Sequence, residues 1–335
     1  MAINFGNMTL DEFLEEWNNS SSYVRVHTSG STGAPKPMLV EKSRMLASAR
    51  RTNDFLGLRE GDTALLCMSL DYIAGKMMVV RALERGLKLM TVEPSGHPLA
   101  TISFSADFAA MVPMQVYNSL QVPEERERLR QIRHLIVGGG AIDDELALQL
   151  KAFPNAIWST YGMTETLSHI ALRRMNGPDA SEWYTPFPSV TIGLSDEGSL
   201  VVDAPEVCPQ TLTTNDIAEI APSGIAFRIL GRKDNIICSG GLKIQAELLE
   251  NQLRPYIRVP YLISKRSDKK FGEIVVLLTE GVPDEAREVC ERILPKYHRP
   301  RAYVHVDQIP LTATGKPARH EAELLAQREP PIICR

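Results

Sequence analysis

The chain contains few of the residues that build disulfide frameworks or zinc sites. Among its 335 residues there are five cysteines, and no two of them form a C-x-x-C pair. The sequence therefore predicts neither a zinc site nor a disulfide framework. Reduced thiols in the cytoplasm are the simplest interpretation of such scattered cysteines. The five positions are Cys67, Cys208, Cys238, Cys290 and Cys334.

Long apolar runs and an excess of charge of one sign are also absent. No segment has the roughly 20 consecutive apolar residues that a membrane-spanning helix needs. The N-terminal stretch MAINFGNMTLDEFLEEW lacks the basic and apolar parts of a signal peptide. With a formal net charge of −4, neither nucleic acid nor an anionic membrane is an expected partner. We therefore expect a cytoplasmic protein without stable membrane insertion.

The apolar periodicity predicts an α/β fold. Short apolar strands alternate with helical segments from residue 64 to residue 159, which is typical of a mostly parallel sheet flanked by helices. From about residue 181, frequent prolines indicate a small β-rich part. A small mobile α+β domain follows. We place the boundary at Asp234, with domains at 1–233 and 234–335, because a chain of this length exceeds one ordinary core.

Individual elements follow from capping signals and spacing. Thr9 and Glu12 form a capping box that opens the first helix. Helices are expected at 10–18, 43–55, 73–85, from 115, from 143, at 245–253 and at 284–293. Strands are expected at 23–26, 38–40, 64–68, 87–92, 108–112, 134–137, 156–159, as a pair within 260–279, and at 302–306.

Residues 27–40 read HTSGSTGAPKPMLV, a polar, glycine-containing loop that ends in a lysine between two prolines. A Walker P-loop needs the spacing G-x-x-x-x-G-K-[ST]. Gly30 and Gly33 are too close for that spacing, and Lys36 is followed by Pro37. By itself the stretch is either a plain loop or a turn whose backbone N–H groups hold phosphate oxygens.

Four further motifs occur later in the chain. They are GGGA at 138–141, YGMTET at 161–166, GRKDNIICSGG at 231–241 and PLTATGK at 310–316. Together with TSGSTGAPK at 28–36, and in the same order, they resemble the signatures of the adenylate-forming enzymes. This superfamily comprises acyl-CoA synthetases, luciferases and the adenylation domains of peptide synthetases.

The resemblance implies a reaction in two steps that uses ATP, Mg²⁺ and CoA. A carboxylate attacks the α-phosphate of ATP to give acyl-AMP and pyrophosphate, and a thiol then displaces AMP. The implied β- and γ-phosphate ligands are Thr28, Ser29, Gly30, Ser31, Thr32, Gly33 and Lys36. Gly139, Gly140, Ala141, Tyr161, Gly162 and Met163 would surround the adenine.

The same resemblance assigns the reacting groups. Thr164 would contact the α-phosphate, and Glu165 would hold Mg²⁺, which prefers carboxylate and phosphate oxygens. Lys316 would bridge the carboxylate and the α-phosphate, so that Lys316, Thr164 and Glu165 are the implied catalytic residues. Asp216 and Arg232 would bind the ribose, although Asn215 stands where the family has glycine.

The second domain is expected to rotate between the two steps. Asp234 matches the family hinge, and Ser239, Gly240 and Gly241 would border the channel for CoA. Most relatives carry a long segment before the phosphate loop. Since this loop begins at Thr28, much of the usual first subdomain is expected to be absent, and a homodimer is one way of covering the exposed surface.

Two stretches suggest the acid. YGMTETLSHIALR at 161–173 and DYIAGKMMVVR at 71–81 are similar to the o-succinylbenzoate–CoA ligase family of menaquinone biosynthesis. The aromatic diacid of that family needs a cation or donor for its remote carboxylate. The candidates are Ser168, His169, Lys76 and Arg81.

Several alternatives stay open at this point. Lys76 and Arg81 could lie on a helix surface, and His169 could be a structural histidine. The enzyme could act on another aryl or short acyl acid, or load a carrier protein. A nucleotide-binding protein without turnover is a further alternative.

Overall fold

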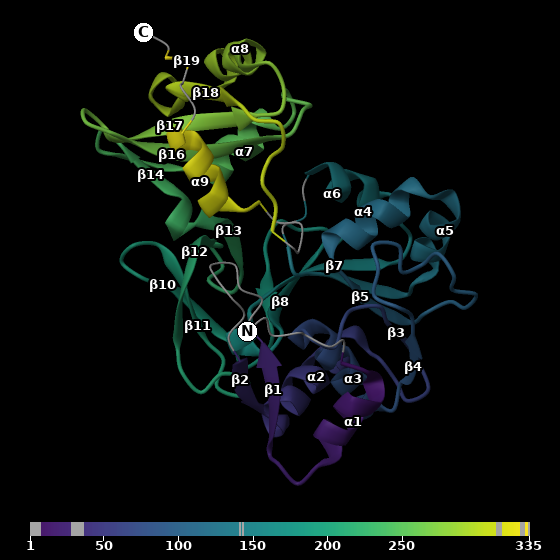
Figure 1. Cartoon of the computed structure of the whole chain (residues 1–335). Coiled ribbons are helices and arrows are strands. Elements are labelled where there is room, and N and C mark those ends of the chain that lie inside the picture. The colour runs from purple at the N-terminus through teal and green to yellow at the C-terminus, as the bar shows by residue number, and fades with distance from the viewer. Residues whose placement is uncertain are drawn as a thin grey trace, which may run out of the picture. The chain divides into compact units, whose positions relative to one another are not determined.

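A computed structural model describes residues 8–27, 37–140, 142, 144–312, 317–328 and 332–333 (Figure 1). The chain divides into two compact units. Unit 1 comprises Met1–Gly193, Val201–Leu212 and Ile220–Arg228, and unit 2 comprises Leu194–Leu200, Thr213–Glu219 and Ile229–Arg335. The expected phosphate loop at 28–36, Ala141 and Lys316 lie outside the described residues.

Unit 1 begins with a helix and a small hairpin. The capping box of Thr9 and Glu12 opens α1 (Leu10–Asn18), as the sequence predicts. Strands β1 (Tyr23–His27) and β2 (Pro37–Glu41) pair antiparallel. They lead into α2 (Lys42–Leu56), which Gly57 ends in the left-handed conformation at φ 64°.

A seven-stranded sheet in the order β4-β3-β5-β6-β7-β8-β9 forms the body of unit 1. Its first five strands are parallel, with connecting helices between them, so the predicted mostly parallel sheet flanked by helices is confirmed. The strands are β3 (Thr63–Leu66), β4 (Lys88–Thr91), β5 (Phe108–Met111), β6 (His134–Val137), β7 (Ala156–Gly162), β8 (His169–Arg174) and β9 (Thr185–Pro186).

Helices cover both faces of this sheet (Figure 1). On one face α4 (Pro113–Gln121), α5 (Pro123–Gln131) and α6 (Asp144–Lys151) contribute Val116, Leu129 and Leu146 to a common apolar core. On the other face lie α2 and α3 (Ile73–Arg85). Burial on both faces explains why the strands read as short, nearly continuous apolar runs.

Strands β8 and β9 depart from the parallel pattern. Both pair antiparallel, β8 with β7 and β9 with β8. The chain reverses directly between β7 and β8 through a short 3₁₀ turn at Thr164–Thr166, and a connection this short can join only antiparallel neighbours. This reversal carries the YGMTET motif.

A separate four-stranded sheet has the order β10-β11-β12-β13. Its strands are β10 (Thr191–Leu194), β11 (Ser199–Asp203), β12 (Leu212–Ile220) and β13 (Phe227–Arg232), which together with β9 make up the β-rich part that the prolines indicated. A short 3₁₀ turn at Lys233–Asn235 follows β13.

The continuous part of unit 2 is an α+β sandwich with two apolar layers. Val275 and Leu277 of β17 face α7 and α8, whereas Val276 and Leu278 face α9, as expected from the two-residue repeat of a strand. The elements are β14 (Ile236–Ser239), β15 (Leu242–Gln245), α7 (Ala246–Leu253), β16 (Tyr261–Asp268), β17 (Gly272–Thr279), α8 (Pro283–Ile293), β18 (Ala302–His305), α9 (Arg319–Arg328) and β19 (Ile332–Ile333).

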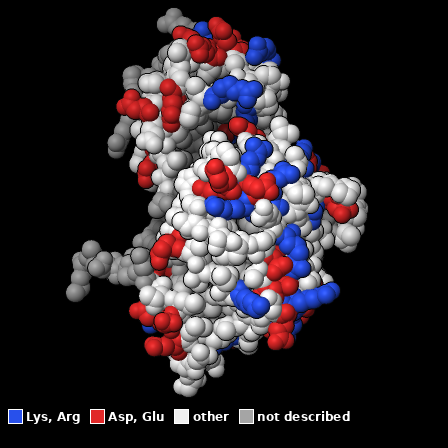
Figure 2. Space-filling model, turned by 90° about the vertical axis from the view of Figure 1, so that its right-hand side faces the viewer, with Lys and Arg blue, Asp and Glu red and all other residues white. Residues whose placement is uncertain are grey.

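The surface carries charges of both signs. On the face in Figure 2, acidic and basic side chains are interspersed, in keeping with the small net charge. No helix in the described part of the chain has the length and apolar character needed to cross a membrane. Of the cysteines that the structure describes, Cys67, Cys208 and Cys290 are buried free thiols, and Cys238 is an exposed one.

Candidate active site

The glycine loop follows β6 at the carboxyl end of the parallel strands. Gly138 N–H donates to the carbonyl of Met111 at 3.1 Å. A Cβ at Gly138 would lie 2.2 Å from Thr160 Oγ1 on the neighbouring strand, and Gly139 has φ 78°. Glycine is therefore required for close approach to β7 and for the turn itself. Gly140 ends the described part of this motif. Ligands of open α/β sheets bind at this edge.

The reversal between β7 and β8 is tightly built. A Cβ at Gly162 would lie 2.3 Å from the carbonyl oxygen of Ser168 and 2.5 Å from the Cα of His169. Leu167 adopts a positive φ of 66°, which is rare for a residue with a Cβ. The two sides of the turn are thus held in backbone contact, which fixes the side chains between them.

Among the polar side chains of the turn, that of Thr166 holds the turn together, whereas those of Thr164 and Glu165 do not. Thr166 Oγ1 accepts from the N–H of Met163 at 3.1 Å and lies 2.8 Å from the carbonyl of Ser168, so this side chain closes the turn. The Thr164 hydroxyl and the exposed Glu165 carboxylate have no hydrogen bond or ion pair with any described residue. These two groups remain available to a ligand.

Tyr161 lies in an aromatic cluster at the end of β7. Its ring centroid is 5.0 Å from that of Phe227 in an edge-to-face arrangement and 5.9 Å from that of Tyr184. Such contacts hold a ring in one orientation. The cluster therefore provides a rigid apolar wall beside the turn that holds Met163, Thr164 and Glu165.

A buried polar chain lies behind the same turn. Arg81 of α3 donates through Nη2 to Ser168 Oγ at 2.6 Å. Ser168 Oγ lies 3.3 Å from His169 Nδ1, and His169 Nε2 lies 3.0 Å from Thr52 Oγ1 of α2. Arg81 is 2% exposed, His169 7% and Thr52 0%. The structure thus brings three of the four predicted acid-binding residues together.

The hydrogen-bonded chain from Arg81 to Thr52 contains a positive charge that is not balanced by a negative one among the described residues. Among the described residues, no carboxylate forms an ion pair with Arg81, and no group forms a hydrogen bond with its buried Nε. Burial lowers the pKa of Arg81 to about 10, so the guanidinium is still charged at neutral pH. Burial, and then the positive charge of Arg81, lower the pKa of His169 well below its usual value, so its imidazole is neutral. This hydrogen-bonded chain of side chains therefore carries one buried positive charge, that of Arg81.

Lys76, the fourth candidate, has other partners. It precedes Arg81 by five residues on α3, which turns its side chain about 140° away around the helix axis. Its ammonium donates to the carbonyl of Arg25 at 2.6 Å and lies 3.7 Å from the carboxylate of Glu16. It also lies 5.6 Å from the ring centroid of Phe13. Because Lys76 is committed to α1 and β1, we do not include it in the acid-binding group.

The expected ribose and hinge residues meet within unit 2. Arg232 Nη1 donates to Asp216 Oδ1 at 3.4 Å, and Arg232 Nη2 donates to Asp234 Oδ2 at 3.4 Å. Asn215, the departure from the family pattern, donates to Asp234 Oδ2 at 3.2 Å. The side chain of Arg232 therefore links the carboxylates of Asp216 and Asp234, which the sequence analysis assigned to ribose binding and to the hinge.

Ser239, Gly240 and Gly241 lie where β14 turns into β15. Gly240 has φ 58° and Gly241 φ 85°, both in the left-handed region. Two such residues between antiparallel strands are the pattern of a type I′ hairpin turn, which itself favours glycine. A Cβ at Gly241 would meet no atom within 4 Å. Hairpin geometry thus accounts for both glycines, and the channel role stays a prediction.

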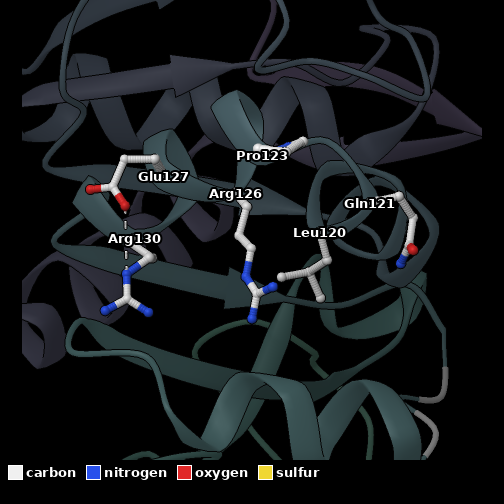
Figure 3. Close-up of a pocket in the computed structure, with 6 residues that line it drawn as sticks. All are labelled: Leu120, Gln121, Pro123, Arg126, Glu127 and Arg130. Atoms are coloured by element: carbon white, nitrogen blue, oxygen red, sulfur yellow. Dashed lines mark ion pairs between the residues drawn. The ribbon is translucent and has the colours of Figure 1, made fainter.

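The remaining predicted residues cannot be placed. Ala141, Lys316 and the phosphate-loop residues Thr28, Ser29, Gly30, Ser31, Thr32, Gly33 and Lys36 are outside the described ranges. A shallow pocket elsewhere lies over α4 and α5 (Figure 3). It is lined by Leu120, Gln121, Pro123, Arg126, Glu127 and Arg130, with Glu127 and Arg130 forming an ion pair at 3.8 Å. None of the predicted site residues lines it.

The fold is that of the AMP-binding enzymes. The family model for the AMP-binding enzyme matches residues 10–210, more than half of the chain, so the chain belongs to that family. A curated relative, 2-succinylbenzoate–CoA ligase of Bacillus cytotoxicus, is 25% identical over 94% of this chain and 72% of its own length. Together the family and such relatives identify the chain as an adenylate-forming acid–CoA ligase.

Solved structures agree with this assignment. An acyl-CoA synthetase (AMP-forming)/AMP-acid ligase II-like protein from Dyadobacter fermentans is 34% identical, with a TM-score of 0.64 over 93% of this chain and 92% of that one. o-Succinylbenzoate CoA synthetase (MenE) from Bacillus subtilis shares the fold at 22% identity. Its complex with OSB-AMP gives a TM-score of 0.73 (89% and 68% coverage), and that with ATP and magnesium gives 0.72 (89% and 69%).

Two residues of the site were not predicted from the sequence. Thr52 sits in an ordinary amphipathic helix, where a buried threonine carries no signal of a role 117 positions away. Thr166 belongs to the YGMTET motif, and its place directly after Thr164 and Glu165 concealed that it builds the turn. A signal for Thr166 does exist, since threonine hydroxyls commonly close local turns.

Proposed function

We propose that this acid–CoA ligase acts on 2-succinylbenzoate in menaquinone biosynthesis. The acid, ATP and CoA would give 2-succinylbenzoyl-CoA, AMP and pyrophosphate. Curated relatives from Bacillus cytotoxicus and Listeria monocytogenes that carry the name of this activity support the proposal, each at 25% identity. The residues behind the β7–β8 turn give it a physical basis.

The observation that carries the proposal is the buried guanidinium of Arg81. A buried cation without a counter-charge is strongly disfavoured, and an unpaired buried N–H donor costs about 1–3 kcal/mol. Arg81 is 2% exposed, has no ion pair with the described residues and keeps its Nε unpaired. Such a group suits an anionic ligand. A diacid supplies that anion, since one carboxylate reacts and the other remains charged.

In the first step, an oxygen of the reacting carboxylate attacks the α-phosphorus of ATP, and the bond to the β-phosphate oxygen breaks. We assign Thr164 to the α-phosphate and Tyr161, Gly162 and Met163, with Gly139 and Gly140, to the adenine. The hydroxyl of Thr164, which has no hydrogen bond with the described residues, and the rigid ring of Tyr161 suit these tasks. Residues 28–36 are assigned to the pyrophosphate, and Lys316 to the charge that develops between the reacting groups.

Glu165 suits a magnesium ion that is shared with the substrate. Within the described residues, no group of three or more His, Cys, Asp or Glu side chains could hold a metal ion. Mg²⁺ commonly binds one or two protein carboxylates together with substrate phosphates, rather than an all-protein cage. The exposed carboxylate of Glu165, which has no partner in the described part of the chain, fits that arrangement. When bound, the ion would neutralise phosphate charge.

In the second step, the CoA thiolate attacks the acyl carbonyl carbon, and the bond to AMP breaks. We assign Asp216 and Arg232 to the ribose, Asp234 to the hinge, and Ser239, Gly240 and Gly241 to the passage of the thiol. The ion pairs among Asp216, Arg232 and Asp234 support a link between ribose contact and hinge. A change of nucleotide at Asp216 would reach Asp234 through a single side chain.

A panel of acids tests the function. CoA-dependent AMP release and acid-dependent ATP–pyrophosphate exchange would be measured with 2-succinylbenzoate, benzoate, succinate and short acyl acids. We expect 2-succinylbenzoate to give the highest kcat/KM in both assays. Activity on another acid alone would reject the substrate assignment. Exchange without CoA consumption would instead indicate loading of a carrier protein, and no exchange with any acid would indicate a nucleotide-binding protein without turnover.

Lys316→Ala tests the division of labour between the two steps. Loss of one preorganised transition-state donor costs about 100- to 1,000-fold in rate. We expect that loss in ATP–pyrophosphate exchange, whereas thioester formation from supplied acyl-AMP should be nearly unchanged. Equal losses in both half-reactions would reject the assignment of Lys316 to adenylation.

A further inference from the structure

Thr52 is the end of the buried chain that holds Arg81, and its hydroxyl can act there in only one way. Thr52 Oγ1 lies 3.2 Å from the carbonyl oxygen of Ser48, one turn earlier in α2. A carbonyl can only accept, so the single hydroxyl hydrogen of Thr52 points to Ser48. In its 3.0 Å contact with His169 Nε2, Thr52 must therefore accept. The hydrogen of that contact belongs to Nε2.

The tautomer of His169 follows from this contact. A neutral imidazole carries one N–H, and burial together with the nearby Arg81 keeps His169 neutral. With the hydrogen on Nε2, Nδ1 is an acceptor. Ser168 Oγ, 3.3 Å away, must then donate to Nδ1, which leaves its lone pairs for the guanidinium of Arg81. Every donor in the chain has one acceptor, from Arg81 Nη2 through Ser168, His169 and Thr52 to the Ser48 carbonyl.

The direction of this chain fixes the guanidinium. Arg81 Nη2 is held at 2.6 Å by Ser168 Oγ, while Nη1 faces the sulfur of Met78 at 3.7 Å. The guanidinium is planar, so fixing one terminal nitrogen fixes the direction in which its other N–H groups point. The direction of the Arg81 Nε–H therefore depends, through Ser168 and His169, on the hydrogen bond from Thr52 to the Ser48 carbonyl in α2.

We propose that Thr52 is a positioning residue for acid recognition: it sets the tautomer of His169 and, through Ser168, orients Arg81 toward the second carboxylate of the acid. This proposal rests on the proposed function for its ligand, whereas the tautomer follows from the chain alone. Nothing in the proposal requires Thr52 to touch substrate.

Removing the Thr52 hydroxyl should disturb recognition rather than chemistry. In Thr52→Val, no acceptor faces His169 Nε2, so the N–H moves to Nδ1, where Ser168 Oγ can accept it. Ser168 Oγ then receives N–H groups from both His169 and Arg81, and its own hydrogen has no acceptor in the chain. Arg81 then shares Ser168 Oγ with His169, so the hydrogen bond that orients its guanidinium is weakened, and the site loses part of its preference for a dianionic acid.

The experiment compares Thr52→Val with Thr52→Ser, which keeps the hydroxyl, and with Ser48→Ala. Ser48→Ala changes a buried residue of the same helix but leaves the accepting carbonyl in place. ATP–pyrophosphate exchange would be measured with 2-succinylbenzoate and with benzoate, which lacks the second carboxylate. The tautomer of His169 would be read from ¹⁵N-histidine NMR spectra, assigned with His169→Gln.

For Thr52→Val we expect a KM for 2-succinylbenzoate about tenfold higher, the effect of about 1.4 kcal/mol in binding. The kcat for this acid and the KM for benzoate should be nearly unchanged. Thr52→Ser and Ser48→Ala should behave like the wild type. NMR should show the Nε2–H tautomer in the wild type and Thr52→Ser, and loss of that form in Thr52→Val.

Two results would overturn the proposal: an Nδ1–H tautomer in the wild type, or an unchanged KM for 2-succinylbenzoate in a folded Thr52→Val. Failure of the proposed function is a separate outcome, seen when the wild type does not use 2-succinylbenzoate but does use another acid. In that case the NMR spectra still decide whether Thr52 sets the tautomer. Tryptophan fluorescence on heating verifies folding, because Trp17, Trp158 and Trp183 all lie in unit 1.

Discussion

Arg319 and Glu250 form a bidentate ion pair within unit 2, at 2.9 Å from Nη1 to Oε1 and 2.7 Å from Nη2 to Oε2. Both also bind the backbone of Ile263, where Glu250 accepts from the N–H and Arg319 donates to the carbonyl, each at 2.9 Å. Burial raises the pKa of Glu250, against the opposing effect of Arg319. The pair thus ties the first residue of α9 to α7 and β16.

Arg319→Leu should therefore destabilise unit 2. Removing one partner of a fully buried ion pair costs about 3–5 kcal/mol, and because the side chains of Arg319 and Glu250 are still 25% and 12% exposed, the cost here should lie below that range. Changing both partners to leucine should recover most of that loss. Amide hydrogen exchange of β16 and β17 would report the stability of this unit. Asp284→Asn, which breaks an exposed pair with Arg287 at 3.5 Å, is the control and should cost less than about 1 kcal/mol. Equal costs for the partly buried and the exposed pair would contradict this account.

Gly162→Ala should disrupt the turn between β7 and β8. The added Cβ would meet two backbone atoms, Ser168 O at 2.3 Å and His169 Cα at 2.5 Å, which cannot move aside without moving the strands. Overpacking of this kind costs about 1–3 kcal/mol. We expect a lower melting temperature by tryptophan fluorescence and a strong loss of ATP–pyrophosphate exchange.

Gly193→Ala is the matched control for that change. Gly193 also lies in a paired strand, β10, but the nearest atom to an added Cβ is Val201 Cβ at 4.0 Å, an ordinary contact. Its melting temperature and exchange rate should stay close to those of the wild type. A Gly162→Ala enzyme as active and stable as Gly193→Ala would show that the turn can relax.

Lys76→Met should lower stability without affecting acid recognition, whereas Arg81→Met should weaken acid recognition. Lys76 binds the Arg25 carbonyl and lies near Glu16, so its loss should lower the melting temperature and leave the KM for 2-succinylbenzoate unchanged. Arg81→Met should raise that KM by about 100-fold or more, the scale of a lost charge-assisted hydrogen bond of about 3 kcal/mol. A raised KM in Lys76→Met with normal stability would return Lys76 to the acid-binding group.

The stability of unit 1 should depend on pH through His169. Its native pKa lies well below the ordinary 6.5, mainly because of burial and then because of Arg81. Below about pH 6.5 the unfolded chain therefore binds a proton that the native one does not. Unfolding free energy should fall with decreasing pH by up to about 1.4 kcal/mol per unit, until the native pKa is reached.

His169→Gln should remove that contribution. Its difference in unfolding free energy from the wild type, followed by tryptophan fluorescence in urea, should be largest above pH 7 and shrink toward pH 5. Other titrating groups are the same in both proteins and cancel in the difference. A difference that stays constant from pH 5 to pH 8 would mean that His169 titrates normally in the native state.

Much of the fold could be predicted because it depends on local patterns. The capping box at Thr9, the left-handed Gly57 and the apolar strands each carry a short-range signal. Helices α5 and α9 were not predicted from the sequence. For α5, the reason is that Pro123–Gln131 is almost entirely polar, with Leu129 as its main apolar contact. Strand β8 was not predicted from the sequence.

The acid-binding group could be proposed but not resolved from sequence. Lys76 and Arg81 are equally plausible as cations five residues apart on one helix. What separates them is contact over long chain distances: Arg25 and Glu16 for the first, Ser168 for the second. No local pattern encodes those contacts, and the same holds for the pairing of Thr52 with His169.

The tight reversal after β7 has a consequence for substrate length. Thr164 and Glu165, assigned to the phosphates and the ion, and Ser168 and His169, assigned to the far end of the acid, belong to one turn clamped by Gly162 and Thr166. With these proposed roles, the span between the reacting and the recognised carboxylate would be set by a few covalently linked residues rather than by two independent walls. The length of the turn would then determine the length of the acid. Inserting or deleting one residue within it should shift the preferred acid length rather than merely widen the pocket.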